Sequence, residues 1–214
     1  MMRPAIYQRC STPDDGRRNR GFTLMELLVV LTIFSTVVVA ATDIFLLSSR
    51  SQRKIFSLER AQADARFTME AMTREIRTGN LDYGYYDGRG TPIGLPEVEL
   101  ALIDSTGAAI RFHESDAGNE EACPEPQSRP CLLVTVGAND PASITPKGVR
   151  VRNLKFYISP TVDPTVFDPV SGSYAADEQP RVTIVLVLET TGTKAEERSV
   201  VYFQTTATNR SYVR

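Results

Sequence analysis

One uninterrupted apolar run, from residue 22 to residue 47, constrains this 214-residue chain more than any other feature. Glu26 and Asp43 are the only charged residues in it. A membrane-spanning helix needs about 20 apolar residues, so the run is long enough to cross a bilayer. Its β-branched residues would suit a strand in water, but an isolated segment in lipid must be helical because no water satisfies its backbone. A buried core helix that follows a basic tail is the alternative.

The residues before the run are basic, with five arginines against two aspartates in residues 1–21. A basic segment before a single apolar segment is typical of a membrane-insertion signal. Arginines at that end hold the N-terminus in the cytosol, so the chain after the run would be exported. We therefore expect a single-pass inner-membrane protein with a cytoplasmic N-terminus and a periplasmic C-terminal domain. The formal net charge of −2 gives no reason to expect a nucleic-acid partner.

The junction between the two segments is the strongest local signal. Gly21 ends the basic segment, Phe22 begins the apolar run, and Glu26 is a lone acid five residues into it. An ordinary secretory signal is cleaved after its apolar segment. A cut between Gly21 and Phe22 would instead leave the apolar helix on the mature protein. The sequence Gly-Phe-Thr-Leu-Met-Glu-Leu at residues 21–27 resembles the N-terminus of type IV pilins and type II secretion pseudopilins.

The resemblance assigns a role to each of these residues. It implies that prepilin peptidase removes residues 1–21 and that the new amine of Phe22 is methylated. It also implies that Glu26 of an incoming subunit neutralises the Phe22 amine of its neighbour in a filament. A carboxylate at the centre of a membrane helix costs about 2.5–3.5 kcal/mol, which independently calls for a partner. Spacing of four residues also allows pairing within one chain, and a Glu26 that reaches the headgroups is the remaining alternative.

From Ser48 the chain becomes polar but keeps a helical apolar stripe. The stripe consists of Ile55, Leu58, Ala65, Met69, Met72 and Ile76. No glycine or proline interrupts residues 22–78, and Gly79 is a stop signal. We expect one helix over 22–78, in the membrane over about 22–47 and amphipathic over 48–78. Its second half would pack on a soluble domain, or present a coiled-coil face. Residues 65–79 also resemble W-type minor pilins and J-type pseudopilins, more loosely.

Residues 79–214 form the expected exported domain. Glycine, proline, aspartate and asparagine separate short runs that are rich in β-forming residues. The predicted strands are 98–103, 109–114, 132–136, 149–158, 182–189 and 199–206, with a hairpin turn at 191–194 and a central strand at 182–188. The predicted fold class is therefore α+β and pilin-like. A long N-terminal helix, membrane-spanning in its first half, packs on an antiparallel β-sheet domain.

Two cysteines remain in the exported domain once Cys10 is removed with the leader. Cys123 and Cys131 bound a nine-residue loop, and an oxidising location favours a disulfide between them. Such a loop closure contributes about 2.6 kcal/mol in the chain-entropy model. Free thiols or a metal site are the alternatives.

Two further segments each have two interpretations. The acid-rich loop at 160–180 could bind Ca²⁺ or remain solvated. The tyrosine-rich segment 82–96 could form a contact patch or a flexible connection.

The sequence gives little support to catalysis. His113 is the only histidine, no nucleophile motif surrounds it, and no dinucleotide, phosphate-loop or zinc-protease motif occurs. We predict no enzyme activity, no cofactor and no metal, with a signal-anchored periplasmic enzyme as the rival.

The predicted function is a minor structural subunit of a type IV pilus or type II secretion pseudopilus, because the helix lacks the proline of many major pilins. Its partners would be prepilin peptidase, other pilin or pseudopilin subunits and inner-membrane lipid. A pilus-associated adhesin or a DNA-uptake pilin is the alternative.

Overall fold

The computed structural model of the chain describes residues 21–90, 92–94, 96–192 and 198–210. Residues 1–20 of the expected leader lie outside the described residues, and so do positions 193 and 194 of the expected hairpin turn. The chain divides into two units, Met1–Ser48 and Ser49–Arg214. Helix α1 (Leu24–Thr78) begins in the first unit and ends in the second.

In the first unit the apolar run is helical, and every residue from 21 to 48 is exposed. Its hydroxyl groups bond within the helix, as those of Thr32 and Ser35 do by donating to the carbonyls of Leu28 and Leu31 at 2.8 Å. Apart from Glu26 and Asp43, the helix therefore exposes mainly apolar side chains, and these hydroxyl groups are satisfied by its own backbone. By length and composition it could cross a membrane.

The second half of α1 contributes one face to the core of the second unit. Ala65, Met69, Met72 and Ile76 are buried, as the apolar stripe predicts. Ile55 is half exposed, at 50%. The buried face therefore begins later along the helix than the stripe does. The helix ends where the Gly79 N–H donates to the carbonyl of Glu75 at 2.8 Å.

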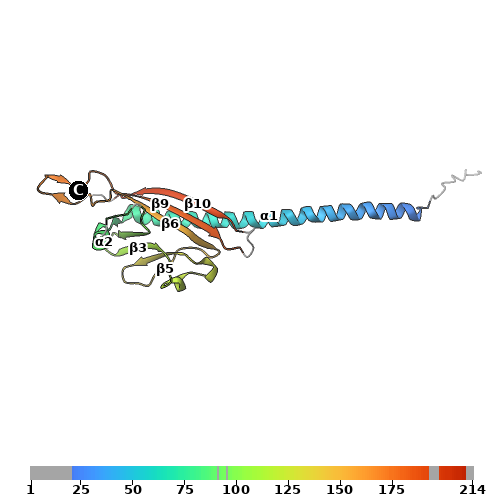
Figure 1. The fold of residues 1–214 in the computed structure, drawn as a ribbon, viewed down its shortest axis with the longest axis horizontal. Helices are drawn as coiled ribbons and strands as arrows, with labels where there is room; N and C mark the ends of the chain where they lie inside the picture. The colour runs from blue at the N-terminus through green and yellow to red at the C-terminus, as the bar shows by residue number, and fades with distance from the viewer. Residues whose placement is uncertain (1–20, 91, 95, 193–197, 211–214) are drawn as a thin grey trace, which may run out of the picture. The chain divides into compact units, whose positions relative to one another are not determined.

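Two antiparallel sheets and a small hairpin complete the second unit (Figure 1). The five-stranded sheet has the order β1 (Asn80–Leu81), β2 (Glu99–Ile103), β3 (Ala109–Glu114), β4 (Leu132–Val136), β5 (Ala142–Ser143). The three-stranded sheet has the order β10 (Val200–Thr208), β9 (Arg181–Thr190), β6 (Val149–Ser159). The hairpin pairs β7 (Phe167–Asp168) with β8 (Ser173–Tyr174). The single expected sheet is thus two, because β4 pairs with β5 and β6 pairs with β9.

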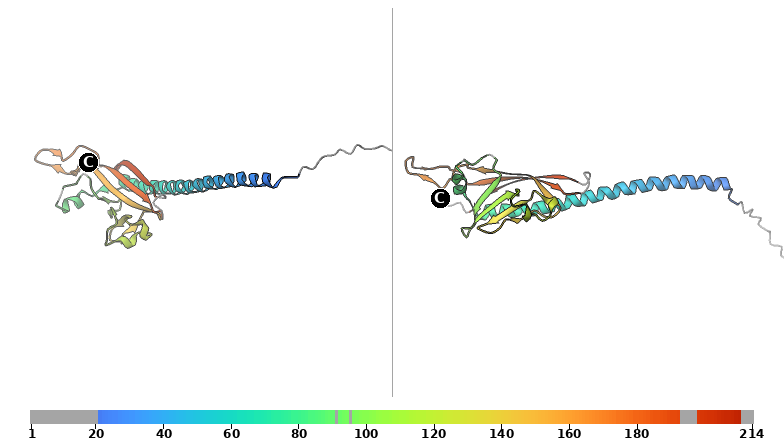
Figure 2. Two further views of the ribbon diagram at one scale, coloured as in Figure 1. Left: turned by 45° about the vertical axis from the view of Figure 1, so that its right-hand side comes forward. Right: turned by 60° about the horizontal axis from the view of Figure 1, so that its bottom comes forward.

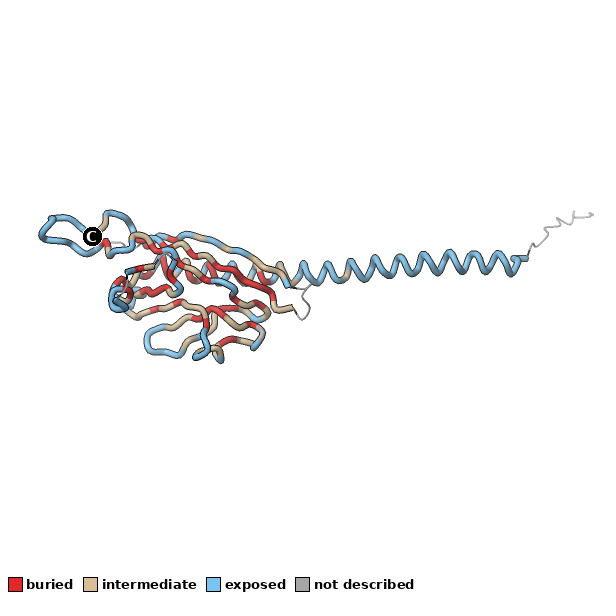
Figure 3. Tube along the Cα trace, in the orientation of Figure 1, coloured by how far each residue is buried: buried red, intermediate tan, exposed pale blue. Residues whose placement is uncertain are grey.

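One hydrophobic core joins the helix to both sheets. It contains Met72 from α1, Leu100 and Phe112 from the five-stranded sheet, and Phe156 and Leu186 from the three-stranded sheet. Figure 2 shows the three-stranded sheet against the second half of α1 from two further directions, and Figure 3 shows the buried residues gathered there. The predicted α+β class, a long helix packed on antiparallel sheets, is confirmed.

The tyrosine-rich segment forms part of the core instead of a flexible connection. It contains helix α2 (Tyr83–Gly88), which Asp82 caps by accepting the N–H of Tyr85 at 3.0 Å. Tyr86 is fully buried, and its hydroxyl accepts the N–H of Ala101 at 2.9 Å. Burial raises the pKa of Tyr86 well above its ordinary value, so the hydroxyl stays protonated.

Candidate functional site at the start of helix α1

The junction residues lie directly before α1 without regular secondary structure. Gly21 and Phe22 are both exposed, Phe22 at 73%. Thr23 caps the helix: its Oγ1 accepts the N–H of Glu26 at 3.2 Å, and its carbonyl accepts the N–H of Leu27 at 3.1 Å. The sequence prediction did not include Thr23, although Thr-x-x-Glu is the signature of a capping box and could have identified it.

Glu26 lies in the first turn of α1, where its carboxylate is exposed. A negative charge in a first helical turn interacts favourably with the positive end of the helix dipole, by about 0.3–1 kcal/mol. Within the described part of the chain, no cation forms an ion pair with this carboxylate. Glu26 therefore has a local role in starting the helix and remains able to pair with a cation from outside the described residues.

Gly21 is not required by the packing around it. A Cβ atom placed on this residue would meet no atom within 4 Å. The described structure would accept a side chain at this position. The described residues therefore impose no steric requirement for glycine at this position.

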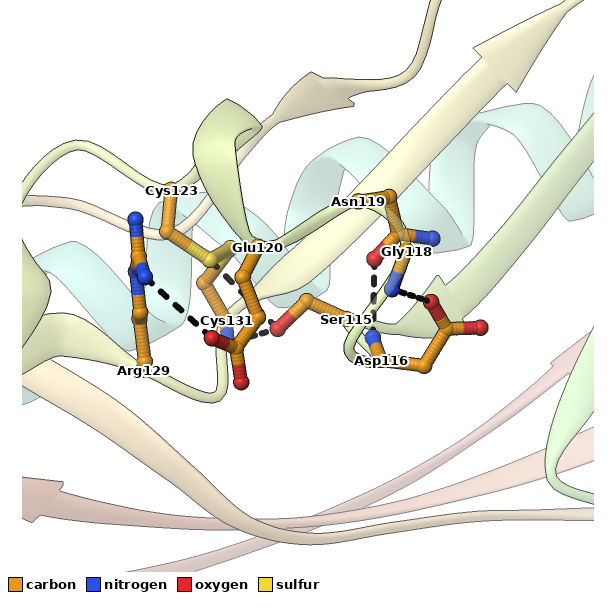
Figure 4. Close-up of polar contacts among 8 residues, drawn as sticks. All are labelled: Ser115, Asp116, Gly118, Asn119, Glu120, Cys123, Arg129 and Cys131. Carbon is orange, nitrogen blue, oxygen red and sulfur yellow. Dashed lines mark hydrogen bonds and ion pairs between the residues drawn. A yellow bond between two sulfur atoms is a disulfide. The ribbon is translucent and has the colours of Figure 1, made fainter.

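The structure contains a disulfide between Cys123 and Cys131 (Figure 4). Ser115 contacts both cysteines. Its Oγ accepts the N–H of Cys131 at 2.9 Å and lies 3.4 Å from the Sγ of Cys123. An ion pair of 3.2 Å between Arg129 and Glu120 crosses the loop. One short 3₁₀ turn, η1 (Glu120–Ala122), precedes Cys123, and a second, η2 (Pro126–Ser128), lies within the loop. These contacts give the cysteines a structural role.

The acid-rich loop at 160–180 is organised by turns. The carboxylates of Asp163 and Asp168 accept the backbone N–H groups of Thr165 and Val170 at 2.8 Å. The hydrogen bond from the Val170 N–H is the main cause that lowers the pKa of Asp168 below its ordinary value. Among the described residues, no group of three or more potential ligands is placed to hold a metal ion.

His113 lies on β3 in a half-buried position. Its Nδ1 is 3.1 Å from the carbonyl oxygen of Glu114. Burial raises the pKa of the Glu114 carboxyl, and the charge of Lys155 partly offsets this rise. Among the described residues, no serine, threonine or cysteine side chain forms a hydrogen bond with this imidazole.

Comparison with known proteins identifies the same segment of the chain. Residues 16–42 match the family described as the prokaryotic N-terminal methylation motif. The match includes Gly21, Phe22 and Glu26 and covers the start of α1. No curated protein and no solved structure matches the chain. The chain therefore carries a prokaryotic N-terminal methylation motif, which supports the resemblance to type IV pilins and pseudopilins, and has a pilin-like α+β fold.

Proposed function

We propose that this protein is a minor structural subunit of a filament, either a type IV pilus or a type II secretion pseudopilus. Before assembly it is anchored in the inner membrane, with its N-terminus in the cytoplasm and the 79–214 domain in the periplasm. Prepilin peptidase cuts between Gly21 and Phe22, and the new amine is methylated. The observation that carries the proposal is the exposed Gly21–Phe22 junction, directly before an apolar helix with one acid in its first turn.

The geometry of the junction supports proteolytic processing. A protease needs a substrate segment that it can reach, and both residues of the expected cut are exposed and outside the helix. The neighbouring Thr23 caps α1 through its side chain and carbonyl, so the helix can begin at Leu24 after the cut. Because the described structure has room for a Cβ at Gly21, we attribute the glycine to recognition by the peptidase.

The proposed role of Glu26 follows from charge compensation. Cleavage creates a positive amine on Phe22, close to the positive end of the helix dipole, where a cation is unfavourable. In lipid both this amine and the Glu26 carboxylate lack water and are costly to bury. An ion pair between Glu26 of an incoming subunit and the Phe22 amine of its neighbour removes both costs. The pair would also set the register between the two helices.

Two features support a minor exported subunit. Helix α1 runs for 55 residues without a proline, unlike the helix of many major pilins. The disulfide between Cys123 and Cys131 is suited to an oxidising compartment such as the periplasm. Within the family, the W-type minor pilins and J-type pseudopilins are the types that we propose as most similar.

The proposed cleavage is tested by replacing Gly21. We expect Gly21→Val to leave residues 1–21 attached, and Gly21→Ala to serve as the conservative control with at least partial removal. The measurement is the intact mass of the protein isolated from native membranes. A wild-type protein that begins at Met1 would contradict the proposal, and so would normal removal of the leader from Gly21→Val.

The proposed assembly role is tested by Glu26→Gln, which keeps the size of the side chain and removes its charge. We expect normal leader removal and at least a tenfold lower yield in sheared filaments, which corresponds to about 1.4 kcal/mol. Asp43→Asn is the matched control, because it removes the other acid of the apolar run and should leave the yield unchanged. Equal filament yields for the two variants would refute the role of Glu26.

A further inference from the structure

A cluster of three cations directly follows the apolar run. Arg50, Arg53 and Lys54 are the only charged residues between Asp43 and Glu59. Their spacing of three and four residues places them on one face of α1. All three are exposed, and none of them forms an ion pair within the described residues. The described part of the chain therefore leaves their positive charge without a neutralising partner.

One cation of the cluster lines a hollow of about 260 Å³ in the second unit. The lining consists of Arg53 and Ser57 of α1, Gly148, and residues 190–192. The two loops in this lining are joined, because the Thr191 N–H donates to the carbonyl of Gly148 at 2.9 Å. The described lining residues include a guanidinium and hydroxyl groups but no acid. Such a lining fits a group that only accepts hydrogen bonds, as the oxygens of a phosphate diester do.

Exposed apolar side chains lie in the same turns of the helix as the cations. Ile55 is 50% exposed and Phe56 is 67% exposed, directly after Lys54. The buried face of α1 begins only at Ala61, so the protein core does not cover these two side chains (Figure 3). Cations together with exposed aromatic and aliphatic side chains on a helix are typical of the boundary between lipid and water.

The length of the chain brings these cations to the surface of a membrane that the apolar run spans. They follow Leu47, the last residue of the run, by three to seven residues, which is about 5–10 Å of helix. The headgroup layer on each side of a bilayer is about 5–7 Å thick. The run is about 39 Å long as a helix against a hydrocarbon core of about 30 Å, and a helix accommodates such an excess by tilting. Tilting lowers the following residues, and long cationic side chains then reach the headgroups.

We propose that Arg50, Arg53 and Lys54 bind the phosphate groups of anionic phospholipids at the surface of the membrane that the apolar run spans. The hollow at Arg53 receives one headgroup, and Ile55 and Phe56 contact the boundary between headgroups and acyl chains. A lipid is favoured over a free anion, because only a lipid satisfies the cations and the apolar side chains together. The inference rests on the proposed function in one respect, that the run spans a membrane, and it requires neither cleavage nor assembly.

The proposal is tested with the full chain in lipid vesicles. The chain contains no tryptophan, so Phe56→Trp adds a single fluorescent reporter at an exposed position. The protein is reconstituted into phosphatidylcholine vesicles with the same fraction of either brominated phosphatidylglycerol, which is anionic, or brominated phosphatidylcholine, which is zwitterionic. Bromine on an acyl chain quenches tryptophan only at short range. We expect stronger quenching by the anionic lipid, because the cations enrich it around the reporter. Equal quenching by the two lipids, or quenching by neither, would overturn the proposal.

The cations are then removed together from the reporter protein. Each lysine or arginine near an anionic surface favours binding about fivefold, so the loss of three should bring quenching by the anionic lipid down to the zwitterionic level. The replacements are Arg50→Gln, Arg53→Gln and Lys54→Gln. The matched control removes the same charge from three exposed arginines later in α1, Arg66, Arg74 and Arg77. This control should keep the preference, and circular dichroism checks that both variants keep the helix content. A preference that survives in the first variant, or is lost equally in both, would contradict the proposal.

Two further conditions identify the source of the phosphate and separate this proposal from the proposed function. Inorganic phosphate and chloride are compared at equal ionic strength. A preference that phosphate alone abolishes would show that the hollow binds the free anion, and it would contradict a lipid ligand. Flotation reports whether the chain enters the vesicles. A chain that floats with them and is quenched equally by both lipids refutes the lipid contact and leaves the proposed membrane-anchored subunit in place. A chain that does not float would refute the membrane anchor on which both proposals depend.

Discussion

At the scale of single residues, Glu189 on β9 is a buried charge of the second unit. Its side chain is buried, and the guanidinium groups of Arg150 and Arg152 contact its Oε2. Burial alone would raise the pKa of this carboxyl. The two arginines outweigh burial and hold the pKa of Glu189 below its ordinary value. The ionised carboxylate is therefore part of the folded structure.

Replacing Glu189 should weaken the fold and change its response to acid. Because its pKa is lower in the folded state, its stabilising effect is present above an unfolded pKa of about 4.3 and is lost as the pH falls through the folded value. We expect Glu189→Gln to lower the free energy of unfolding by about 2 kcal/mol at pH 7, since both arginines are partly exposed. Below pH 4 the difference from wild type should shrink.

The measurement is urea unfolding of the full chain in detergent between pH 3 and pH 7. Glu59→Gln is the matched control, because Glu59 is exposed on α1 and should change stability by less than about 0.5 kcal/mol. A Glu189→Gln variant with the same stability as this control at pH 7 would show that the ion pair does not stabilise the fold.

The residues of the junction show how much of the candidate site was accessible from sequence. Gly21, Phe22 and Glu26 were assigned by resemblance, because no periodicity marks a peptide bond that another enzyme recognises. Thr23 was missed even though its capping role depends only on local spacing. The pairing of Glu26 between subunits stays a prediction, because its proposed partner belongs to a second chain.

At the scale of elements, the end of α1 depends on one close approach. A Cβ on Gly79 would lie 2.8 Å from the carbonyl oxygen of Ile103 on β2 and 3.0 Å from that of Glu75. Both are backbone atoms of regular elements, so neither can move aside without shifting the helix or the sheet. Glycine therefore fixes how closely α1 approaches the five-stranded sheet.

We expect Gly79→Ala to lower the free energy of unfolding by about 1–3 kcal/mol, since it forces extra volume into a packed position. Gly88→Ala is the control, because a Cβ at Gly88 would meet nothing within 4 Å. That replacement should be neutral or slightly stabilising. The two variants are compared by thermal and urea unfolding. A Gly79→Ala protein as stable as Gly88→Ala would mean that the helix and sheet adjust at no cost.

The strands show which structural features a sequence pattern can predict. The predicted run 149–158 agrees with β6 to within one residue, since buried and exposed side chains alternate along it, apart from a bulge between Val151 and Asn153. The near-continuous apolar run at 182–188 is the central strand β9. The two-residue strands such as β1 and β5 are too short to show any period. The division into two sheets depends on pairing between distant segments, which alternation does not report.

At the scale of the whole molecule, the two units of the chain are suited to two different solvents, lipid for the first and water for the second. Residues 22–47 expose apolar side chains throughout, whereas the unit Ser49–Arg214 buries its apolar residues in a core of its own. Water would disfavour the first arrangement and favour the second. The requirement for a membrane should therefore be confined to the first unit.

We expect a fragment of residues 49–214, produced in an oxidising compartment, to remain in solution and to unfold cooperatively. The full chain should instead sediment with membranes and require detergent for extraction. The measurements are membrane fractionation and circular dichroism with increasing temperature. A fragment that aggregates with its disulfide intact, or a full chain that stays in solution without detergent, would contradict this division.

The bond between Cys123 and Cys131 also has a consequence for how the protein responds to proteolysis. If a host or environmental protease cut the chain once between these two cysteines, the two pieces would remain tied together covalently. Strand β3 before the cut and strand β4 after it would stay paired. Such a nicked chain would remain one covalent molecule, heavier by one water, until a reductant separated it into two fragments.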